Sequence, residues 1–397
     1  MNSSTYKARR VKLSKYIGHS DYVVTAFNAV QQTNDAAAPF IQEANFWYLT
    51  GIEEPGWTLV VSKDAVATLI APDISEVHRI FDGGLSDEAA QEVSGVDLVV
   101  SKKEGDVLLD NLLKSEEAIG VIADDPYEKY HSFAMNEAPK KLYAHIVKNA
   151  NEVFDIRQML ANMRAVKTAE EVEVMRRAID VTVDAFDAVK EKVHNLKHEY
   201  NLDAEFTYAF RNHGATHAYE PIVAAGKNAC TLHYQKNSAE LPGNGLVLMD
   251  VGARMGGYCA DITRTYAIGT PSQREIDVHA AVEYAHRKII ALLVPGLKVK
   301  EYHDSVDEIM KDALSSLGLL NKPDDYRTYF PHAISHGLGI DVHDSLGGPV
   351  VFEPGMVLTV EPGIYIPEEG IGVRIEDDIL ITETGHENLS GKLSTAL

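Results

Sequence analysis

Short apolar runs alternate with helical patterns of apolar residues along the first part of the chain. The runs predict strands at Tyr22–Ala26, Thr58–Val61, Ala67–Ala71, Asp97–Val100 and Gly120–Ala123. The helical patterns include Glu88–Val93 and Asp106–Leu113. Strands that alternate with helices are typical of an α/β domain, so we expect such a domain here.

The pattern changes near residues 164–167, where a long helix is predicted. Thr168 and Glu171 have the spacing of a capping box, in which each side chain binds the backbone N–H of the other residue. Apolar residues follow at helical spacing, at Val172, Met175, Ile179, Val183 and Phe186. Two further helices are predicted, Gln273–Leu293 and Val299–Leu317, each followed by a glycine.

Strands rich in Val, Ile, Thr and Tyr lie between and after these helices, in blocks of their own. Helices and strands in separate blocks are typical of an α+β domain. We therefore predict two domains, a smaller α/β domain over residues 1–164 and an α+β domain over residues 165–397. A chain of 397 residues is also long for a single hydrophobic core.

The first candidate for chemistry is a hairpin that carries two acids. Asp250 ends the apolar run that starts at Leu246, and a glycine-containing turn leads to a second strand with Asp261. If the turn is centred between Met255 and Gly256, Asp250 lies directly opposite Asp261. Opposed Cβ atoms are roughly 4.5–5.5 Å apart, so two like charges are destabilising there unless a cation lies between them.

A second hairpin repeats this arrangement. Glu361 ends another apolar run, and a turn centred just after Glu368 places it opposite Glu376. Alternation along the return strand puts Arg374 on the same face as Glu376 and opposite Gly363. Any one of these acids alone is best explained as an exposed strand carboxylate. Four acids at the ends of apolar strands, however, predict buried carboxylates that need partners.

Histidines supply a further set of possible ligands. His332, His336 and His343 fall within residues 331–344, and His233 precedes the first hairpin. Oxygen-rich sites with one imidazole suit Mn(II), Fe(II), Co(II) or Zn(II). Four carboxylates and one histidine are enough to hold two such ions. The sequence therefore predicts a metal centre built from both hairpins.

Composition and charge narrow the possible partners and the compartment. The formal net charge is -22, which repels phosphate backbones, so we expect no nucleic-acid binding. The chain contains no apolar run long enough to cross a membrane, and its basic, polar first residues have no signal-peptide pattern. Its two cysteines, Cys230 and Cys259, suit a reducing compartment. We therefore expect a cytoplasmic protein.

The segment from about residue 165 to 390 resembles the catalytic domain of the pita-bread, or creatinase-like, metallopeptidases, and most of all the aminopeptidase P and prolidase branch. The motifs that carry the resemblance are Leu248–Gly252, Ala260–Thr265, Ser335–Gly339, Glu361–Tyr365 and Gly372–Asp378. The block Asn45–Gly51 is similar to the N-terminal, creatinase-type domain of aminopeptidase P. One departure is Ile80-Phe81, where some members have a Trp-Phe pair.

The resemblance implies two divalent metal ions, with Mn(II) expected first and Co(II), Zn(II) or Fe(II) as alternatives. Asp250 would bind one ion, His336 and Glu361 the other, and Asp261 and Glu376 would bridge them. The implied reaction is attack by a hydroxide between the two ions on the bond that precedes proline at the N-terminus of a peptide. A homodimer or homotetramer is also implied.

Roles for the remaining candidates are implied in the same way. Glu361 would accept and pass on the proton, and His332 and His343 would donate hydrogen bonds to the substrate carbonyl and the developing oxyanion. The other candidates would contact substrate: His233 and Arg374 on the proline side, and Tyr365 and Asp35 as further contacts.

Three other activities fit the same motifs. A prolidase would cleave only Xaa-Pro dipeptides and needs a clamp for their C-terminal carboxylate. A methionine aminopeptidase shares the metal ligands but usually lacks so large an N-terminal domain. A relative that binds peptides without cleaving them would be expected to lack some of the ligands.

Overall fold

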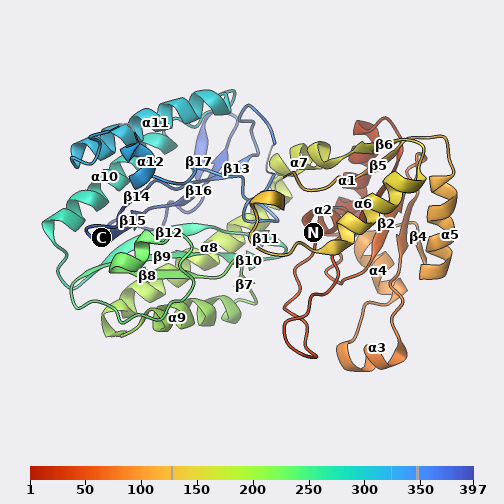
Figure 1. Cartoon of the computed structure of the whole chain (residues 1–397), viewed down its shortest axis with the longest axis horizontal. Helices are drawn as coiled ribbons and strands as arrows, with labels where there is room; N and C mark the ends of the chain where they lie inside the picture. Colours follow the sequence, from red (N-terminus) through yellow and green to blue (C-terminus); the bar gives the residue numbers. More distant parts are fainter. Residues whose placement is uncertain (127, 323, 346–347) are drawn as a thin grey trace. The chain divides into compact units, whose positions relative to one another are not determined.

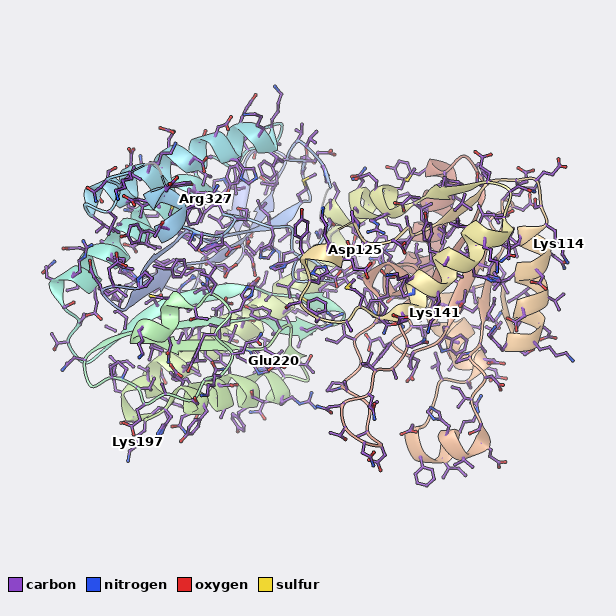
Figure 2. The ribbon with its side chains drawn as sticks, in the orientation of Figure 1. Lys114, Asp125, Lys141, Lys197, Glu220 and Arg327 are labelled. Carbon is purple, nitrogen blue, oxygen red and sulfur yellow. The ribbon has the colours of Figure 1, made fainter. Side chains whose placement is uncertain are left out.

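The computed structural model describes residues 1–126, 128–322, 324–345 and 348–397. It divides into two compact units, Met1–Leu160 and Ala161–Leu397 (Figure 1). Side chains fill the spaces within each unit, and charged ones such as Lys114, Lys197 and Arg327 are exposed (Figure 2). None of the helices in the described part of the chain is long and apolar enough to cross a bilayer.

The N-terminal unit is built on one six-stranded mixed sheet with the order β4-β3-β2-β1-β5-β6. Its strands are β1 (Asp21–Thr25), β2 (Thr58–Val61), β3 (Ala67–Ile70), β4 (Leu98–Val100), β5 (Ile119–Val121) and β6 (Val153–Asp155). The helices are α1 (Ser3–Tyr16), α2 (Ala44–Thr50), α3 (Glu76–Asp82), α4 (Asp87–Ser94), α5 (Lys102–Leu113) and α6 (Glu137–Asn149). The five predicted strands and two predicted helices are all present, whereas β6 was missed.

Helix α1 forms where the basic N-terminal sequence suggested no element. Arg9 and Arg10 are buried, and their guanidinium groups donate to backbone carbonyls, for example from Arg10 Nη1 to Leu49 O at 2.7 Å. Carbonyl partners of this kind allow an arginine to occupy an interior position. A pattern based on apolar residues alone therefore misses this helix.

The C-terminal unit contains the predicted long helices. Its helices are α7 (Arg157–Ala165, which begins in the other unit), α8 (Ala169–Lys192), α9 (Glu199–Asn212), α10 (Gln273–Ile290), α11 (Val299–Ser316) and α12 (Asp325–Tyr329). Thr168 and Glu171 form the predicted capping box at the start of α8. Helices α10 and α11 pack their apolar faces, including Val282 and Met310, against strands of the C-terminal part of the chain.

The strands of this unit form small antiparallel sheets with the orders β8-β9-β12, β7-β10-β11, β13-β16-β17 and β14-β15. Their bounds are β7 (Thr216–His217), β8 (Ile222–Ala225), β9 (Gly245–Val251), β10 (Ala253–Met255), β11 (Tyr258–Cys259), β12 (Ile262–Ile268), β13 (Val357–Val360), β14 (Gly363–Ile366), β15 (Ile371–Arg374), β16 (Asp377–Ile381) and β17 (His386–Asn388). An isolated bridge between Thr263 and Glu376 joins the two hairpin regions.

The predicted register of the first hairpin is wrong by two residues. Met255 pairs with Tyr258, so the turn is centred between its two glycines, and Asp250 lies opposite Thr263. Asp261 precedes β12 and becomes a diagonal neighbour of Asp250. Since a shift of two residues preserves the face of a strand, both acids still point to the same side.

The predicted register of the second hairpin is correct on both sides of a break. Gly363 pairs with Arg374, as predicted, and Val360 pairs with Asp377 in the same register. Glu361 and Glu376 fall at the break between these ladders, so they do not form a ladder pair of their own. Glu376 bridges to the first hairpin, which brings the two pairs of acids together.

Removal of a ring from the core of this unit should be costly. Phe186 on α8 is fully buried, and its ring lies 4.9 Å from that of Phe206. We expect Phe186→Ala to lower the free energy of unfolding by about 3–5 kcal/mol, because it leaves a cavity. Urea denaturation measures this loss. Tyr208→Ala on α9, at a residue that is 64% exposed, should change it by less than about 0.5 kcal/mol; equal effects would contradict the packing described.

Candidate metal centre

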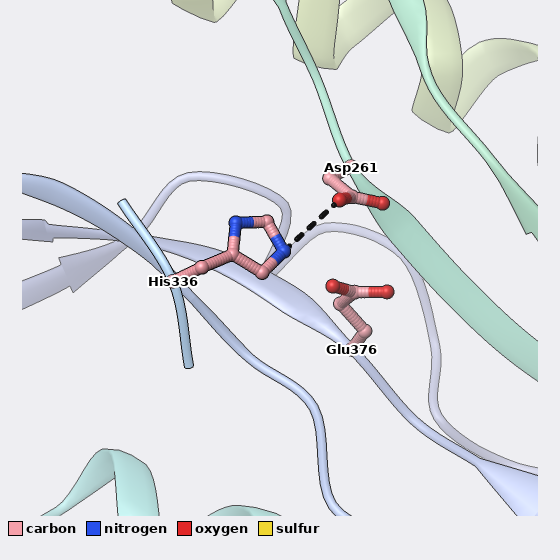
Figure 3. A group of neighbouring side chains, drawn as sticks. All are labelled: Asp261, His336 and Glu376. Atoms are coloured by element: carbon pink, nitrogen blue, oxygen red, sulfur yellow. Dashed lines mark ion pairs between the residues drawn. The ribbon is translucent and has the colours of Figure 1, made fainter. Parts of the chain in front are cut away.

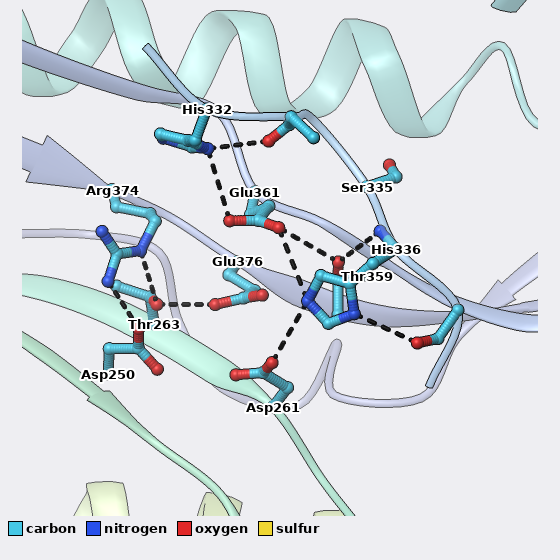
Figure 4. Close-up of polar contacts among 12 residues, drawn as sticks. Asp250, Asp261, Thr263, His332, Ser335, His336, Thr359, Glu361, Arg374 and Glu376 are labelled. Carbon is cyan, nitrogen blue, oxygen red and sulfur yellow. Dashed lines mark hydrogen bonds and ion pairs between the residues drawn. The ribbon is translucent and has the colours of Figure 1, made fainter. Parts of the chain in front are cut away.

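Four acids and one histidine from separate parts of the C-terminal unit converge on one site (Figure 4). Asp250 lies near the end of β9, Asp261 just before β12, Glu361 after β13 and Glu376 just before β16. His336 lies in the segment between α12 and β13. Asp250, Asp261 and Glu376 are all less than 10% exposed. The structure therefore brings together all five residues predicted as metal ligands.

Asp261, His336 and Glu376 form the tightest group (Figure 3), with ligand atoms within 4.8 Å of one another. The Nδ1 of His336 lies 3.1 Å from the carbonyl oxygen of Gly337, which can only accept, so Nδ1 carries a proton. The other nitrogen, Nε2, faces Asp261 at 3.4 Å and Glu361 at 3.6 Å. An imidazole fixed in this way presents Nε2 either as a charged donor or as a metal ligand.

Arg374 occupies the opposite side of the site (Figure 4). Its guanidinium is buried and forms an ion pair with Asp250, and it donates to Thr263 Oγ1 at 3.1 Å and to Tyr365 OH at 2.8 Å. Tyr365 OH lies 2.9 Å from Nε2 of His332. Arg374 and Tyr365 were both predicted as substrate contacts. In this structure Arg374 binds both Tyr365 and Asp250 and so fixes their positions.

Burial is the main influence on the acids. It raises the pKa of Glu376 well above its usual value, and the neighbouring charges of Asp261, Glu361 and Asp250 act in the same direction. Burial also raises the pKa of Glu361 to about 7, although His336 and Arg374 oppose the change. Thr263 Oγ1 donates to Glu376 at 2.6 Å. One neutral hydroxyl does not compensate a buried carboxylate in such a group of like charges.

The histidines divide into two kinds. Burial alone would lower the pKa of His336, but the hydrogen bond to Asp261 and the charges of Glu361 and Asp261 raise it to about 9. Burial lowers the pKa of His332 to about 3, with help from Arg374, and that of His343 to about 4, with help from His336. His332 and His343 are therefore neutral near pH 7, as hydrogen-bonding groups rather than charges.

The acids and histidines line one cavity of about 390 Å³. Its described lining also includes the predicted residue His233, together with Ile222, Leu232 and Val342, which provide apolar wall. Asp35 lies on an exposed loop of the N-terminal unit, and its contact with substrate stays a prediction.

The sequence patterns missed Tyr219 as a site residue. Its hydroxyl lies 2.5 Å from Oδ1 of Asp250 and 2.5 Å from Oδ1 of Asp261. A hydroxyl has one proton, so it cannot satisfy both carboxylates fully. Tyr219 is not part of a regular pattern of apolar residues and does not lie in a paired strand. The sequence therefore contained no indication of its role. Thr263 could have been found, because it alternates with Asp261 onto the same face.

The donor set fits divalent cations. Four carboxylates and one imidazole face one another, whereas Arg374 is the one arginine or lysine among the described residues that line the cavity. The four acids therefore outnumber the site's own positive groups, Arg374 and the protonated His336, and cations of the oxygen-preferring kind would supply the difference.

Comparisons with known proteins agree with this chemistry. The sequence model of "Metallopeptidase family M24" matches residues 173–383, and that of "Aminopeptidase P, N-terminal domain" matches residues 6–121. The Xaa-Pro aminopeptidase of Escherichia coli is 35% identical over 94% of this chain and 90% of its own length. The Xaa-Pro dipeptidase of Pyrococcus furiosus is 29% identical over 87% of this chain and 90% of its own length.

A solved structure gives the same result for the fold. Aminopeptidase P from E. coli with the inhibitor Pro-Leu superimposes with a TM-score of 0.86 and 32% identity, over 99% of this chain and 96% of that one. The predicted fold class, a pita-bread α+β domain preceded by a smaller creatinase-type α/β domain, is thereby confirmed.

The stabilisation given by a divalent cation should grow as the pH rises. In the metal-free protein the folded pKa values of Glu361, about 7, and His336, about 9, exceed their ordinary values of 4.5 and 6.5. Their contribution to stability is therefore lost as the pH rises through these values, and a bound cation replaces the protons. The Tm with Mn(II) minus the Tm with chelator should increase from pH 7 to pH 9.

The same measurement on His336→Gln gives the control. This variant keeps Glu361 but loses the imidazole, so its difference in Tm should rise less steeply over the same pH range. A difference that shrinks with pH in the unaltered protein would contradict the assignment of protons to these two groups.

Proposed function

The chain belongs to metallopeptidase family M24, and from this premise we propose that it hydrolyses the bond between the first residue of a peptide and a following proline. One observation carries the proposal: four acids and an imidazole from two hairpins and a loop line a single cavity. The similarity to the Xaa-Pro aminopeptidase of E. coli supports the choice of substrate.

Asp250, Asp261, His336, Glu361 and Glu376 would hold two divalent ions. When bound, such ions polarise a carbonyl oxygen and make a water molecule more acidic. Glu361 would take the proton of the attacking water, since it lines the cavity beside the other candidate ligands. It would then pass this proton to the proline nitrogen as the bond breaks.

Hydrogen bonds from two neutral imidazoles would orient the substrate. His343 carries one N–H donor in its neutral form and lines the cavity, which supports a contact with the developing oxyanion. The Nδ1 of His332 donates to Ala333 O at 2.7 Å, and its Nε2 accepts from Tyr365. His332 would therefore donate to substrate only after its proton moves to Nε2, which releases Tyr365.

Selection for proline would rest on shape. Proline forms a tertiary amide without an N–H, so a wall that offers no acceptor at this position favours it over other residues. His233 and the apolar residues Ile222 and Leu232 line the cavity and are suited to contact the ring. Arg374 and Tyr365 would support this side of the site, and Asp35 would be a further contact.

Charge favours an aminopeptidase over a dipeptidase. Arg374, the one arginine or lysine in the described lining, already contacts Asp250, Thr263 and Tyr365. A free C-terminal carboxylate next to proline would find no further arginine or lysine among the described residues that line the cavity. The acids of the wall, with Glu220 among them, suit the ammonium group of a peptide N-terminus instead. The similarity to the Xaa-Pro dipeptidase of P. furiosus makes cleavage of dipeptides the second candidate activity.

Finer features of the enzyme are proposals as well. Mn(II) is proposed as the metal because carboxylates dominate the donor set, although Co(II), Zn(II) or Fe(II) would fit the same ligands. A cytoplasmic location accords with the two free cysteines. A homodimer or homotetramer, and functional domains divided after residue 164, rest on the resemblance to aminopeptidase P.

Two substitutions should separate metal binding from proton transfer. Asp261→Ala should lose both bound metal and activity, since it removes a carboxylate of the tightest ligand group. Glu361→Ala should lower kcat on Ala-Pro-Ala by at least about 100-fold, because it removes the proton acceptor. Metal content by mass spectrometry and peptide hydrolysis give the two readouts. Glu353→Ala, at an exposed site, should keep both. Full turnover by either site variant would refute the scheme.

A series of peptides should separate the two candidate activities. The kcat/KM for Ala-Pro-Ala should exceed that for Ala-Pro by about tenfold or more, because the free carboxylate of the dipeptide meets acids, and Arg374 is already paired with Asp250. Ala-Pro amide, which lacks this charge, should recover part of the loss. Chromatographic detection of released alanine measures all three. Cleavage of Ala-Pro alone would establish the dipeptidase, and cleavage of Met-Ala-Ala would remove the requirement for proline.

A further inference from the structure

Glu199, at the start of α9, is a fully buried acid outside the metal centre. Its carboxylate accepts four hydrogen bonds. Oε1 accepts from Ala225 N at 2.8 Å and Asn228 Nδ2 at 2.9 Å, and Oε2 accepts from Tyr234 OH at 2.9 Å and Ala239 N at 2.8 Å. A carboxylate has about four acceptor positions, so this group is saturated by neutral donors.

The four donors lie at the two ends of one chain segment, residues 225–239. One oxygen of Glu199 binds the beginning of the segment, where β8 leads into a short 3-10 helix, and the other binds its end. The backbone adds to this closure, because Glu199 N donates to Ala239 O at 3.0 Å and Leu241 N donates to Lys197 O at 2.8 Å. Glu199 therefore closes the segment into a loop against α9.

This loop carries one wall of the candidate active site. Leu232, His233 and Gln235 line the cavity that contains the acids and histidines. Within the described part of the chain, the His233 ring makes no hydrogen bond, and the residue is exposed. The main chain of the loop therefore decides where the His233 ring lies over the cavity.

We propose that Glu199 is a positioning residue, which fixes the loop 225–239 so that His233 lies against the proline side of the substrate. This inference rests on the proposed function for the identity of the substrate, and on the hydrogen bonds alone for the placement of the loop. Glu199 does not touch the predicted metal ligands, so its loss should affect substrate placement and leave the metals bound.

Glutamine is the informative replacement because it keeps the shape of the side chain. In Glu199→Gln one oxygen becomes an NH₂ group, which cannot accept from the two donors at one end of the loop. Two buried donors then lose their partner, and that end of the loop is released. A displacement of the order of 1 Å near a reacting group can lower the rate by about 100-fold.

The test combines kinetics with hydrogen exchange on the full-length, Mn(II)-loaded protein. Glu199→Gln should lower kcat/KM for Ala-Pro-Ala by about 10- to 100-fold, and His233→Ala should lower it as well. The double variant should lose less than the two single losses combined, because Glu199 acts through the loop that carries His233. Hydrogen exchange followed by mass spectrometry should be faster in residues 225–239 of Glu199→Gln, with metal content unchanged.

Each outcome decides a different claim. Additive losses in the double variant, or unchanged exchange in the loop, would overturn the role of Glu199. An inactive unaltered protein would refute the proposed function, while the exchange result would still decide whether Glu199 holds the loop. Glu205→Gln makes the same change on the same helix at an ion pair with Lys192, and it should stay within about twofold of the unaltered protein.

If Glu199→Gln does not fold, Tyr234→Phe serves in its place. This change removes one donor at one end of the loop and leaves the carboxylate intact. Its effect should be smaller, about two- to tenfold on kcat/KM, and it should likewise shrink in the His233→Ala background. A loss of undiminished size in that background would overturn the proposal.

Discussion

The mutual repulsion of buried carboxylates is the constraint on which the C-terminal unit depends. Asp250, Asp261, Glu361 and Glu376 line one cavity, and burial disfavours the charged forms of Asp250, Glu361 and Glu376. Arg374 forms an ion pair with Asp250, and the Tyr219 hydroxyl is shared between Asp250 and Asp261, so only part of this charge is compensated. The rest of the unit holds the acids at this separation despite the repulsion, and that rigidity is what a site for divalent cations requires.

The four acids are held close together by breaks in the two hairpins. Gly252 lies at the break between β9 and β10, where an added Cβ would lie only 1.8 Å from Ala260 O, so only glycine allows the strands to approach there. At the corresponding break in the second hairpin, Glu376 leaves its own partner strand and bridges to Thr263. Asp261, Glu361 and Glu376 thus lie where strands exchange partners, and Asp250 lies two residues before such a break. The exchange joins the two hairpins into one site.

These acids could be predicted because the prediction rests on the alternation of side chains between the two faces of a strand. An error of two residues in register leaves each side chain on the same face. The prediction placed Gly363 opposite Arg374 correctly, and it placed Asp250 opposite Asp261 incorrectly, yet in both hairpins the faces were right. The sequence could not predict contacts made by residues that belong to no regular pattern of apolar positions. Tyr219 and the buried Arg10 are of this kind, since their partners are far away in sequence or are backbone carbonyls that no residue pattern encodes.

Two other buried acids of the unit show how a buried carboxylate is accommodated without a metal. Asp377 is buried with its partner Arg264, which lowers the pKa of Asp377 against the opposing effect of burial. Glu199 is satisfied by four neutral donors drawn from a single loop. Glu376 has neither solution: one hydroxyl donates to it, and the strongest charge effects on it come from acids. The cost of a buried carboxylate is therefore offset by an arginine at Asp377 and by a loop at Glu199, and in the proposed function divalent cations would offset it at Glu376.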